Sequence, residues 1–300
     1  MLDPDLQEIA RKWKESGLPD MYQTDSGVEA RRRALFARNH FYPKPSIEVG
    51  SVTEALIPGP GISIPVRIVR PRSVSPTGTV IYFHGGGWIV GDLDQYQAHV
   101  ARIADETDSV VINVDYRLAP EHPFPAGLDD ALTAGLWIQR HIDEFGGDSR
   151  KLAVAGDSAG GNLAAAVAIE FRNRGIPLAA QFLLYPSTDL TLSPNPDIVS
   201  KYLGPKYQAV AKDWRVSPAL AESLKGVAPA LIGVGKYDYL YEDNLAFARK
   251  LRQAGATVIL REFPSLNHGF FSYTGVSRVS LDAAQILCRD LKGLLHGRTG

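Results

Sequence analysis

At the centre of the chain stands the stretch Leu152-Ala153-Val154-Ala155-Gly156-Asp157-Ser158-Ala159-Gly160-Gly161-Asn162. An apolar run ends in the pattern Gly-x-Ser-x-Gly, and a helical pattern follows from Asn162 to Phe171. This order predicts a short buried strand that turns sharply into a helix, with Ser158 at the apex, an arrangement called a nucleophile elbow. Glycine suits positions 156 and 160 because a side chain there would collide with the neighbouring strand or helix. The pattern alone also fits a tight turn whose serine has no chemical role.

Composition places the chain among ordinary globular proteins. Its 300 residues allow one large α/β domain with an attached element, or two domains. The hydrophobic content of 45% and charged content of 22% argue against disordered and membrane proteins. A net charge of -1 creates no field that would gather nucleic acid or anionic lipid. We therefore expect neither a nucleic-acid partner nor membrane insertion.

Cellular location is predicted from the cysteine content and from the first residues. Cys288 is the single cysteine, so no intrachain disulfide can form, which fits a reducing compartment. The first residues have neither the basic nor the apolar segment of a signal peptide. No apolar run approaches the ~18 residues that a membrane span needs. We expect a cytoplasmic protein.

The order of predicted elements indicates the fold class. Residues 1–45 predict helices over 5–16 and 26–40 and no strand. The run Arg31-Arg32-Arg33 lies in the second of these helices, and we interpret it as a solvated or salt-bridged face, not as a nucleic-acid patch. Runs at 49–57 and 62–69 alternate and predict an antiparallel hairpin at a sheet edge. From Thr79 onward strands and helices alternate, which predicts a mostly parallel sheet covered on both faces. Residues 186–217 show no clear pattern.

A serine nucleophile needs a base, and chain order limits the candidates. In proteins with this elbow an acid and then a histidine follow the serine. Only His268 and His296 follow Ser158. His296 lies in a charged C-terminal tail, which suits a buried base poorly. His268 follows the predicted strand 257–263, and ligand-facing residues gather where parallel strands end. We therefore predict His268 as the base.

The acid has several candidates between Ser158 and His268. Asp189, Asp197 and Asp213 fall in the segment without a pattern, and Glu242 and Asp243 open a predicted helix, where acidic residues suit the helix dipole. Asp238 stands three residues past the strand Leu231 to Gly235, in the same kind of position as Ser158 and His268. We predict Asp238 as the acid. A role as the N-cap of the following helix is the alternative.

A glycine loop after the strand 79–83 suits the stabilisation of negative charge. The string His84-Gly85-Gly86-Gly87 leaves backbone N–H groups uncovered. Together with the N–H after the serine, that of Ala159, such a loop forms an oxyanion hole. The alternatives are a flexible loop and a phosphate site, but neither phosphate-binding glycine motif is present. No zinc-ligand spacing of Cys and His occurs either, so we expect no metal. His84 precedes Ser158, and we assign it a role in shaping the loop.

Four strings together resemble one family, the hormone-sensitive-lipase-like carboxylesterases, also called bacterial esterase family IV, of the α/β-hydrolases. They are His84-Gly85-Gly86-Gly87-Trp88, Asp115-Tyr116-Arg117-Leu118-Ala119-Pro120-Glu121-His122, Gly156-Asp157-Ser158-Ala159-Gly160-Gly161-Asn162 and Leu266-Asn267-His268-Gly269-Phe270. The resemblance implies an α/β-hydrolase fold, a Ser158–Asp238–His268 triad, and no cofactor or metal. It also implies oxyanion donors at Gly86, Gly87 and Ala159, with Gly85 as a further candidate.

The resemblance further implies a cap over the active site. Residues 1–45 look like the family's helical cap, with a further cap segment at about 187–216, and 46–300 form the catalytic domain. The chain departs from the family at the acid string, which reads Asp238-Tyr239-Leu240-Tyr241-Glu242-Asp243 where the family has Asp-Pro-Leu-x-Asp-Glu. The second cap segment also looks short, which would leave the site more open. For the substrate pocket we name Trp88, Asp157 and Trp214.

The predicted activity is hydrolysis of short- to medium-chain acyl esters through an acyl-enzyme. The same triad also serves amidases. A lipase is disfavoured because no secretion signal and no long apolar lid are seen, and plant gibberellin receptors of similar sequence lack the catalytic histidine that His268 would supply. We expect a small-molecule ester as the partner. For assembly, the resemblance implies a homodimer through a sheet edge near the final strand, which is common in the family. Acyl length, alcohol group and stereopreference are not specified by these motifs.

Overall fold

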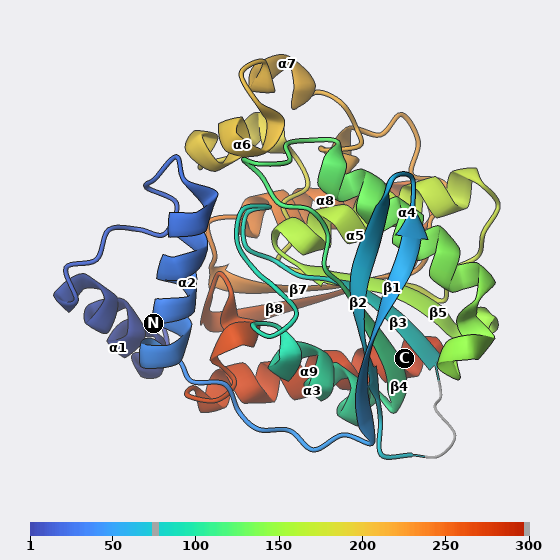
Figure 1. The fold of residues 1–300 in the computed structure, drawn as a ribbon, viewed down its shortest axis with the longest axis horizontal. Helices are drawn as coiled ribbons and strands as arrows, with labels where there is room; N and C mark the ends of the chain where they lie inside the picture. The colour runs from blue at the N-terminus through green and yellow to red at the C-terminus, as the bar shows by residue number, and fades with distance from the viewer. Residues whose placement is uncertain (74–77, 297–300) are drawn as a thin grey trace.

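The computed structural model describes residues 1–73 and 78–296, which form an eight-stranded sheet (Figure 1). The strand order is β1-β2-β4-β3-β5-β6-β7-β8. The hairpin of β1 and β2 is antiparallel and lies at one edge, β2 also runs antiparallel to β4, and the other pairs are parallel. The mostly parallel sheet and its edge hairpin are thus confirmed. The strands are β1 (Ser51–Gly59), β2 (Ile62–Arg70), β3 (Gly78–Phe83), β4 (Ser109–Val114), β5 (Leu152–Asp157), β6 (Ala180–Leu184), β7 (Ala230–Tyr237) and β8 (Val258–Asn267).

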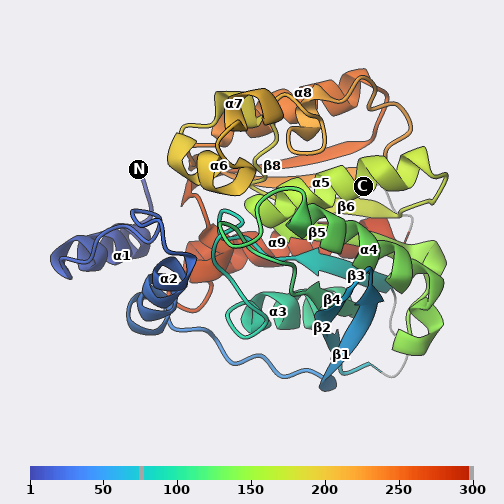
Figure 2. The ribbon, with the colours of Figure 1, turned by 45° about the horizontal axis from the view of Figure 1, so that its top comes forward.

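Helices cover both faces of the sheet, as Figures 1 and 2 show. One face carries α3 (Gln97–Thr107) and α9 (Arg278–Leu295), and the other carries α4 (Ala126–Arg140), α5 (Ala159–Asn173) and α8 (Tyr241–Gln253). Side chains of a strand alternate between the two cores. Tyr82 of β3 belongs to the core under α3 and α9, whereas its neighbour Phe83 belongs to the core under α4, α5 and α8.

Four further helices lie at one end of the sheet. They are α1 (Pro4–Glu15) and α2 (Gly27–Phe41) of the predicted N-terminal cap segment, and α6 (Pro196–Leu203) and α7 (Tyr207–Val210) of the second predicted cap segment. The two segments touch, because Nζ of Lys201 donates to the carbonyl of Tyr22 at 2.6 Å. The N–H of Asp3 donates to the carbonyl of Ser265 at 2.9 Å, which attaches α1 to the catalytic part.

The three consecutive arginines of α2 form ion pairs, as predicted. Arg31 pairs with Glu121 at 2.7 Å, and both Arg32 and Arg33 pair with Glu29, at 2.6 and 3.0 Å. Their charge therefore serves intramolecular contacts.

Among the helices that the structure describes, none combines the length and the apolar character needed to cross a membrane.

The C-terminal ends of three parallel strands converge on one region. β5 leads to Ser158, β7 to Asp238, and β8 directly to His268. β8 reaches Asn267 and is longer than predicted, because Tyr237 and Asn267 pair again beyond an irregularity after Gly235. The helix α4 ends at Arg140 and is followed by a short 3-10 turn, Ile142–Phe145.

Candidate active site

The turn between β5 and α5 is tight and strained at one residue. Ser158 has φ 52° and ψ -114°, a backbone conformation that residues other than glycine rarely adopt. Its N–H donates to the carbonyl of Leu184 at 2.8 Å, which fixes the apex. A Cβ at Gly156 would lie 2.3 Å from the carbonyl oxygen of Gly160, and a Cβ at Gly160 would lie 1.9 Å from that of Phe83. Glycine is therefore required at both positions, as the motif predicts.

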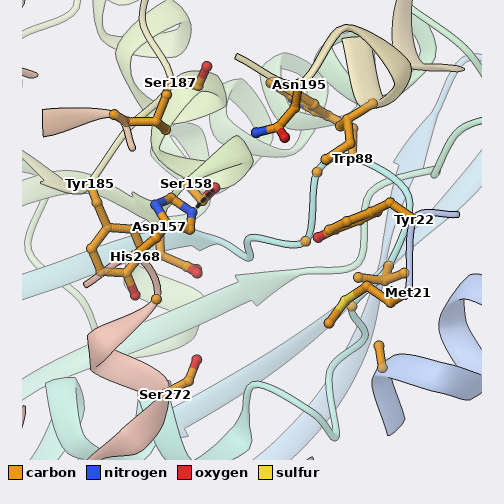
Figure 3. Close-up of a pocket in the computed structure, with 18 of the residues that line it drawn as sticks. Met21, Tyr22, Trp88, Asp157, Ser158, Tyr185, Ser187, Asn195, His268 and Ser272 are labelled. Atoms are coloured by element: carbon orange, nitrogen blue, oxygen red, sulfur yellow. Dashed lines mark hydrogen bonds between the residues drawn. The ribbon is translucent and has the colours of Figure 1, made fainter. Parts of the chain in front are cut away.

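Ser158, His268 and Asp238 form a continuous hydrogen-bonded chain. Nε2 of His268 lies 2.9 Å from Oγ of Ser158 (Figure 3). Nδ1 of His268 lies 3.0 and 2.9 Å from the two carboxylate oxygens of Asp238. Oδ1 of Asp238 also accepts the N–H of Leu240 at 2.7 Å. With Nδ1 donating to the carboxylate, Nε2 presents its lone pair to the serine hydroxyl. This arrangement can remove a proton from Ser158.

The imidazole of His268 is held between two aromatic rings. The ring centre of Tyr185 lies 5.0 Å from it, and that of Tyr239 lies 4.4 Å from it. The side chain of Asp238 has no exposed surface, and that of His268 keeps 20% exposure. The contact between Asp238 and His268 is therefore shielded from water, while Nε2 of His268 faces the cavity.

Three backbone N–H groups are available near Ser158. Gly86 and Gly87 line the cavity, and Ala159 is the first residue of α5. None of their N–H groups donates to an acceptor within the described residues. Gly86 has φ +112°, and a Cβ there would lie 2.2 Å from the carbonyl oxygen of Val90. A Cβ at Gly87 would lie 3.0 Å from Ile198 and 3.1 Å from Tyr22, so both cap segments pack directly on this loop.

Gly85 is not available as an oxyanion donor, which corrects one prediction. Its N–H donates to Oδ1 of Asp157 at 2.8 Å, and the same oxygen accepts the hydroxyl of Tyr82 at 2.7 Å. Asp157 is 3% exposed, and burial raises the pKa of its carboxyl group. The carboxylate thus joins the glycine loop to the residue before the nucleophile. Asp157 also lines the cavity, where the pocket prediction placed it.

His84 lies behind the loop and is not near the serine hydroxyl. Its Nδ1 lies 2.8 Å from the carbonyl oxygen of Gly85, and its ring stacks between Tyr96 and Tyr116 at 5.1 and 4.4 Å. Burial lowers the pKa of His84 to about 4, so the ring is neutral near pH 7. These contacts match the predicted loop-shaping role.

A cavity of about 350 Å³ opens above Ser158 and His268 (Figure 3). It lies between these two residues and the two predicted cap segments, from which Tyr22 and Asn195 face it in Figure 3. Trp88 lines it, with the indole stacked on Tyr202 at a centroid distance of 4.3 Å.

Trp214 lies outside this cavity, contrary to the pocket prediction. It lines a separate surface hollow with Ile169 and Arg172 of α5. The reason is that Nδ2 of Asn162 donates to the carbonyl of Val216 at 2.8 Å, which holds the turn after α7 against α5.

Sequence reasoning missed several cavity residues. Tyr22, Arg38 and Asn195 line the cavity from loops and helix ends of the cap segments, whose positions depend on packing. Within residues 1–73 and 78–296, no group of three His, Cys, Asp or Glu side chains is arranged to hold a metal ion.

Comparison with known proteins agrees with this geometry. Residues 80–272 match the family model described as alpha/beta hydrolase fold. The carboxylic ester hydrolase LipN of Mycobacterium tuberculosis is 40% identical over 90% of this chain and 77% of its own length. The esterase LipI of the same organism is 34% identical over 99% of this chain and 96% of its own length.

Solved esterase structures have the same fold over nearly the whole chain. A thermostable esterase from Pseudomonas putida superposes with a TM-score of 0.90 at 29% identity, covering 98% of both chains. The hyperthermophilic esterase of Pyrobaculum calidifontis superposes with a TM-score of 0.87 at 31% identity, covering 97% of this chain and 98% of its own. The chain therefore belongs to the α/β-hydrolase family, as a hormone-sensitive-lipase-like carboxylesterase.

Proposed function

We propose that this carboxylesterase cleaves short- to medium-chain acyl esters through an acyl-enzyme formed on Ser158. The observation that carries the proposal is the chain of contacts from Ser158 Oγ to His268 Nε2, at 2.9 Å, and from His268 Nδ1 to Asp238. Such a chain activates a hydroxyl that is otherwise a weak nucleophile.

In the proposed first half-reaction, Oγ of Ser158 attacks the ester carbonyl while Nε2 of His268 takes its proton. Asp238 keeps the imidazole in the tautomer with hydrogen on Nδ1 and stabilises the imidazolium that forms. His268 then gives the proton to the departing alkoxide, so an alcohol leaves and the acyl group stays on Ser158. In the second half, water loses a proton to His268 and attacks the acyl carbon. The bond from that carbon to Oγ of Ser158 then breaks, His268 returns the proton to Oγ, and the carboxylic acid leaves.

The oxyanion of each tetrahedral intermediate is proposed to accept the N–H groups of Gly86, Gly87 and Ala159. Their lack of other acceptors within the described chain supports this role. The positive end of α5 adds to the stabilisation, because Ala159 is its first residue. One such donor typically contributes about 10²- to 10³-fold in kcat.

The cavity volume of about 350 Å³ supports esters with short to medium acyl chains. Location and assembly stay predictions from the sequence: a cytoplasmic protein and a homodimer through the sheet edge. β8 stands at that edge of the sheet, which leaves it unpaired on one side in the described chain.

The test is Ser158→Ala assayed with 4-nitrophenyl butyrate and with a serine-reactive fluorophosphonate. We expect loss of turnover and of labelling with an unchanged circular dichroism spectrum. Ser223→Ala, a change far from the cavity, is the matched control and should keep both. Retained turnover in Ser158→Ala would refute the proposal. Assaying the matching 4-nitroanilide separates an esterase from an amidase.

A further inference from the structure

Arg38 places a buried positive charge at the wall of the catalytic cavity. The residue lies near the end of α2, is 7% exposed and lines the cavity that contains Ser158. Its Nη1 donates to the carbonyl of Gln95, and its guanidinium carbon lies 4.7 Å from the ring centre of Tyr96. These contacts orient the guanidinium. The carboxylate of Asp157 acts on its charge only from beyond ion-pair distance.

Comparison with a second buried arginine shows how unusual this is. Arg102 is also 7% exposed, and it pairs with Glu106 at 2.7 Å. For Arg38, no carboxylate oxygen of the described residues lies within the 4.0 Å of an ion pair. A buried charge is costly unless it is paired, so a counter-ion is expected from elsewhere.

The groups around Arg38 are hydrogen-bond donors. Tyr42, Tyr96, Ser272 and Tyr273 line the same cavity, and the rings of Tyr42 and Tyr273 meet edge to face at 5.1 Å. Burial raises the pKa of all three phenols, which keeps their hydroxyls protonated. Figure 3 shows Ser272 at the opposite end of the cavity from Asn195 and Ser187.

More positive charge stands behind this wall. A small adjoining hollow is lined by Arg38, Ser272, Lys44 and His99. Nζ of Lys44 donates to the backbone carbonyl of Asp94 and not to a carboxylate.

The nearest acidic groups are already occupied by other donors. Asp92 accepts the backbone N–H and the amide of Gln95, at 2.6 and 2.7 Å, and Asp157 accepts Tyr82 and Gly85. Asp20, which also lines the cavity, accepts the N–H of Tyr22 at 2.8 Å. No carboxylate of the described residues is therefore ion-paired with Arg38, and its charge can attract an acidic ligand.

We propose that this end of the cavity binds a carboxylate of the substrate, so that the preferred ester is an acidic one, such as the monoester of a dicarboxylic acid. The inference rests on the proposed function of Ser158. A guanidinium matches a carboxylate with two parallel hydrogen bonds, and exclusion of water strengthens the contact. The carboxylate can belong to the acyl part or to the alcohol part of the ester.

The experiment uses pairs of esters that differ only in charge. For the acyl part, the monomethyl esters of succinic, glutaric and adipic acid are each compared with the methyl keto ester that carries acetyl in place of the carboxylate. For the alcohol part, 3-acetoxypropanoate is compared with 4-acetoxybutan-2-one. Hydrolysis is followed by pH-stat titration for the wild type, Arg38→Met, Arg38→Lys and Arg32→Gln. Arg32→Gln removes an equal charge from an exposed position of the same helix.

We expect the wild type to prefer the acidic member of at least one pair by about tenfold or more in kcat/KM. Arg38→Met should abolish that preference mainly by raising KM for the acidic member of each pair, by a much larger factor than for the neutral member. Arg38→Lys should restore part of the preference, and Arg32→Gln should keep all of it.

Two results would overturn the subsite. One is a wild type without preference for the acidic member of any pair. The other is an Arg38→Met variant that loses acidic and neutral substrates equally, as expected if Arg38 only holds α2 against the loop at Gln95. Failure of the proposed function looks different, because the wild type would then hydrolyse neither member of any pair.

Discussion

The backbone N–H of Gly85 donates to Oδ1 of Asp157 at 2.8 Å, joining the loop of the proposed oxyanion donors to the residue before Ser158. A Cβ at Gly85 would lie 2.3 Å from Oδ2 of the same carboxylate, so the two segments are in direct contact. The side chain of Asp157 is therefore one of the contacts that position Ser158 relative to the proposed oxyanion donors.

Asp157→Asn and Asp157→Ala should differ sharply. Asparagine keeps an oxygen that can accept from Gly85 and Tyr82, and it removes a charge that burial disfavours. We expect it to fold normally and to retain kcat within about tenfold. Alanine leaves both donors unpaired, at about 1–3 kcal/mol each in unfolding free energy, and should lower kcat by about 10²-fold or more. Urea unfolding and steady-state kinetics measure the two effects, and equal losses in both variants would contradict this role.

Gly86→Ala should lose activity as well as stability. Its φ of +112° and the 2.2 Å approach of a Cβ to the carbonyl oxygen of Val90 force the loop to move. We expect kcat to fall by about 10²- to 10³-fold, as for the loss of an oxyanion donor. Gly61→Ala is the control, since Gly61 also has a positive φ, +73°, but no atom within 4 Å of a Cβ. Only the first variant should lose kcat.

His84 should make folding sensitive to acid. Burial lowers its pKa from 6.5 to about 4, so the unfolded chain binds a proton at a higher pH than the folded one. Its contribution to stability is thus fully present above about pH 6.5 and is lost as the pH falls toward 4. When the pH is lowered from 7 to 5, the unfolding free energy of both proteins falls. We expect the fall to be about 2 kcal/mol smaller in His84→Asn than in the wild type.

Chemical denaturation at several pH values tests the role of His84. His40→Asn, a change at an exposed position, should keep the wild-type dependence. An identical slope in His84→Asn and the wild type would show that His84 titrates normally.

Tyr202→Phe should be tolerated although the residue is 1% exposed. Its buried hydroxyl has no hydrogen-bond partner in the part of the chain that the structure describes, so its removal relieves an unpaired polar group. We expect unfolding free energy to stay equal or to rise by about 1 kcal/mol. Tyr202→Ala removes the stack on Trp88 and should cost about 3–5 kcal/mol. Thermal unfolding of the two variants measures their relative stability. A Tyr202→Phe variant that is as strongly destabilised as Tyr202→Ala would contradict the prediction.

The fold and the three residues of the hydrogen-bonded chain were predictable because their signals are local. A tight glycine turn identifies Ser158, and strand ends followed by short loops identify Asp238 and His268. Parallel strands bring such ends together at one edge of the sheet, so sequence order alone places these side chains near one another.

The cavity walls were harder to predict, because they depend on packing between distant segments. The helices α6 and α7 are short and left no clear periodicity, and Trp214 was assigned to the pocket although its turn is held against α5. The bond between Gly85 and Asp157 joins residues 72 positions apart. Arg38 did leave a signal: it follows Ala34 by four positions on a buried face of α2.

The missing side chain at Gly87 has a consequence for the divergence of related enzymes. Ile198 and Tyr22 line the cavity, and a Cβ at Gly87 would lie only 3.0 and 3.1 Å from them. A bulkier residue at either position would push the loop that holds the oxyanion donors, and a smaller one would leave that loop unsupported. New substrate ranges obtained by changing these two residues should therefore come with slower turnover until a compensating substitution restores the loop.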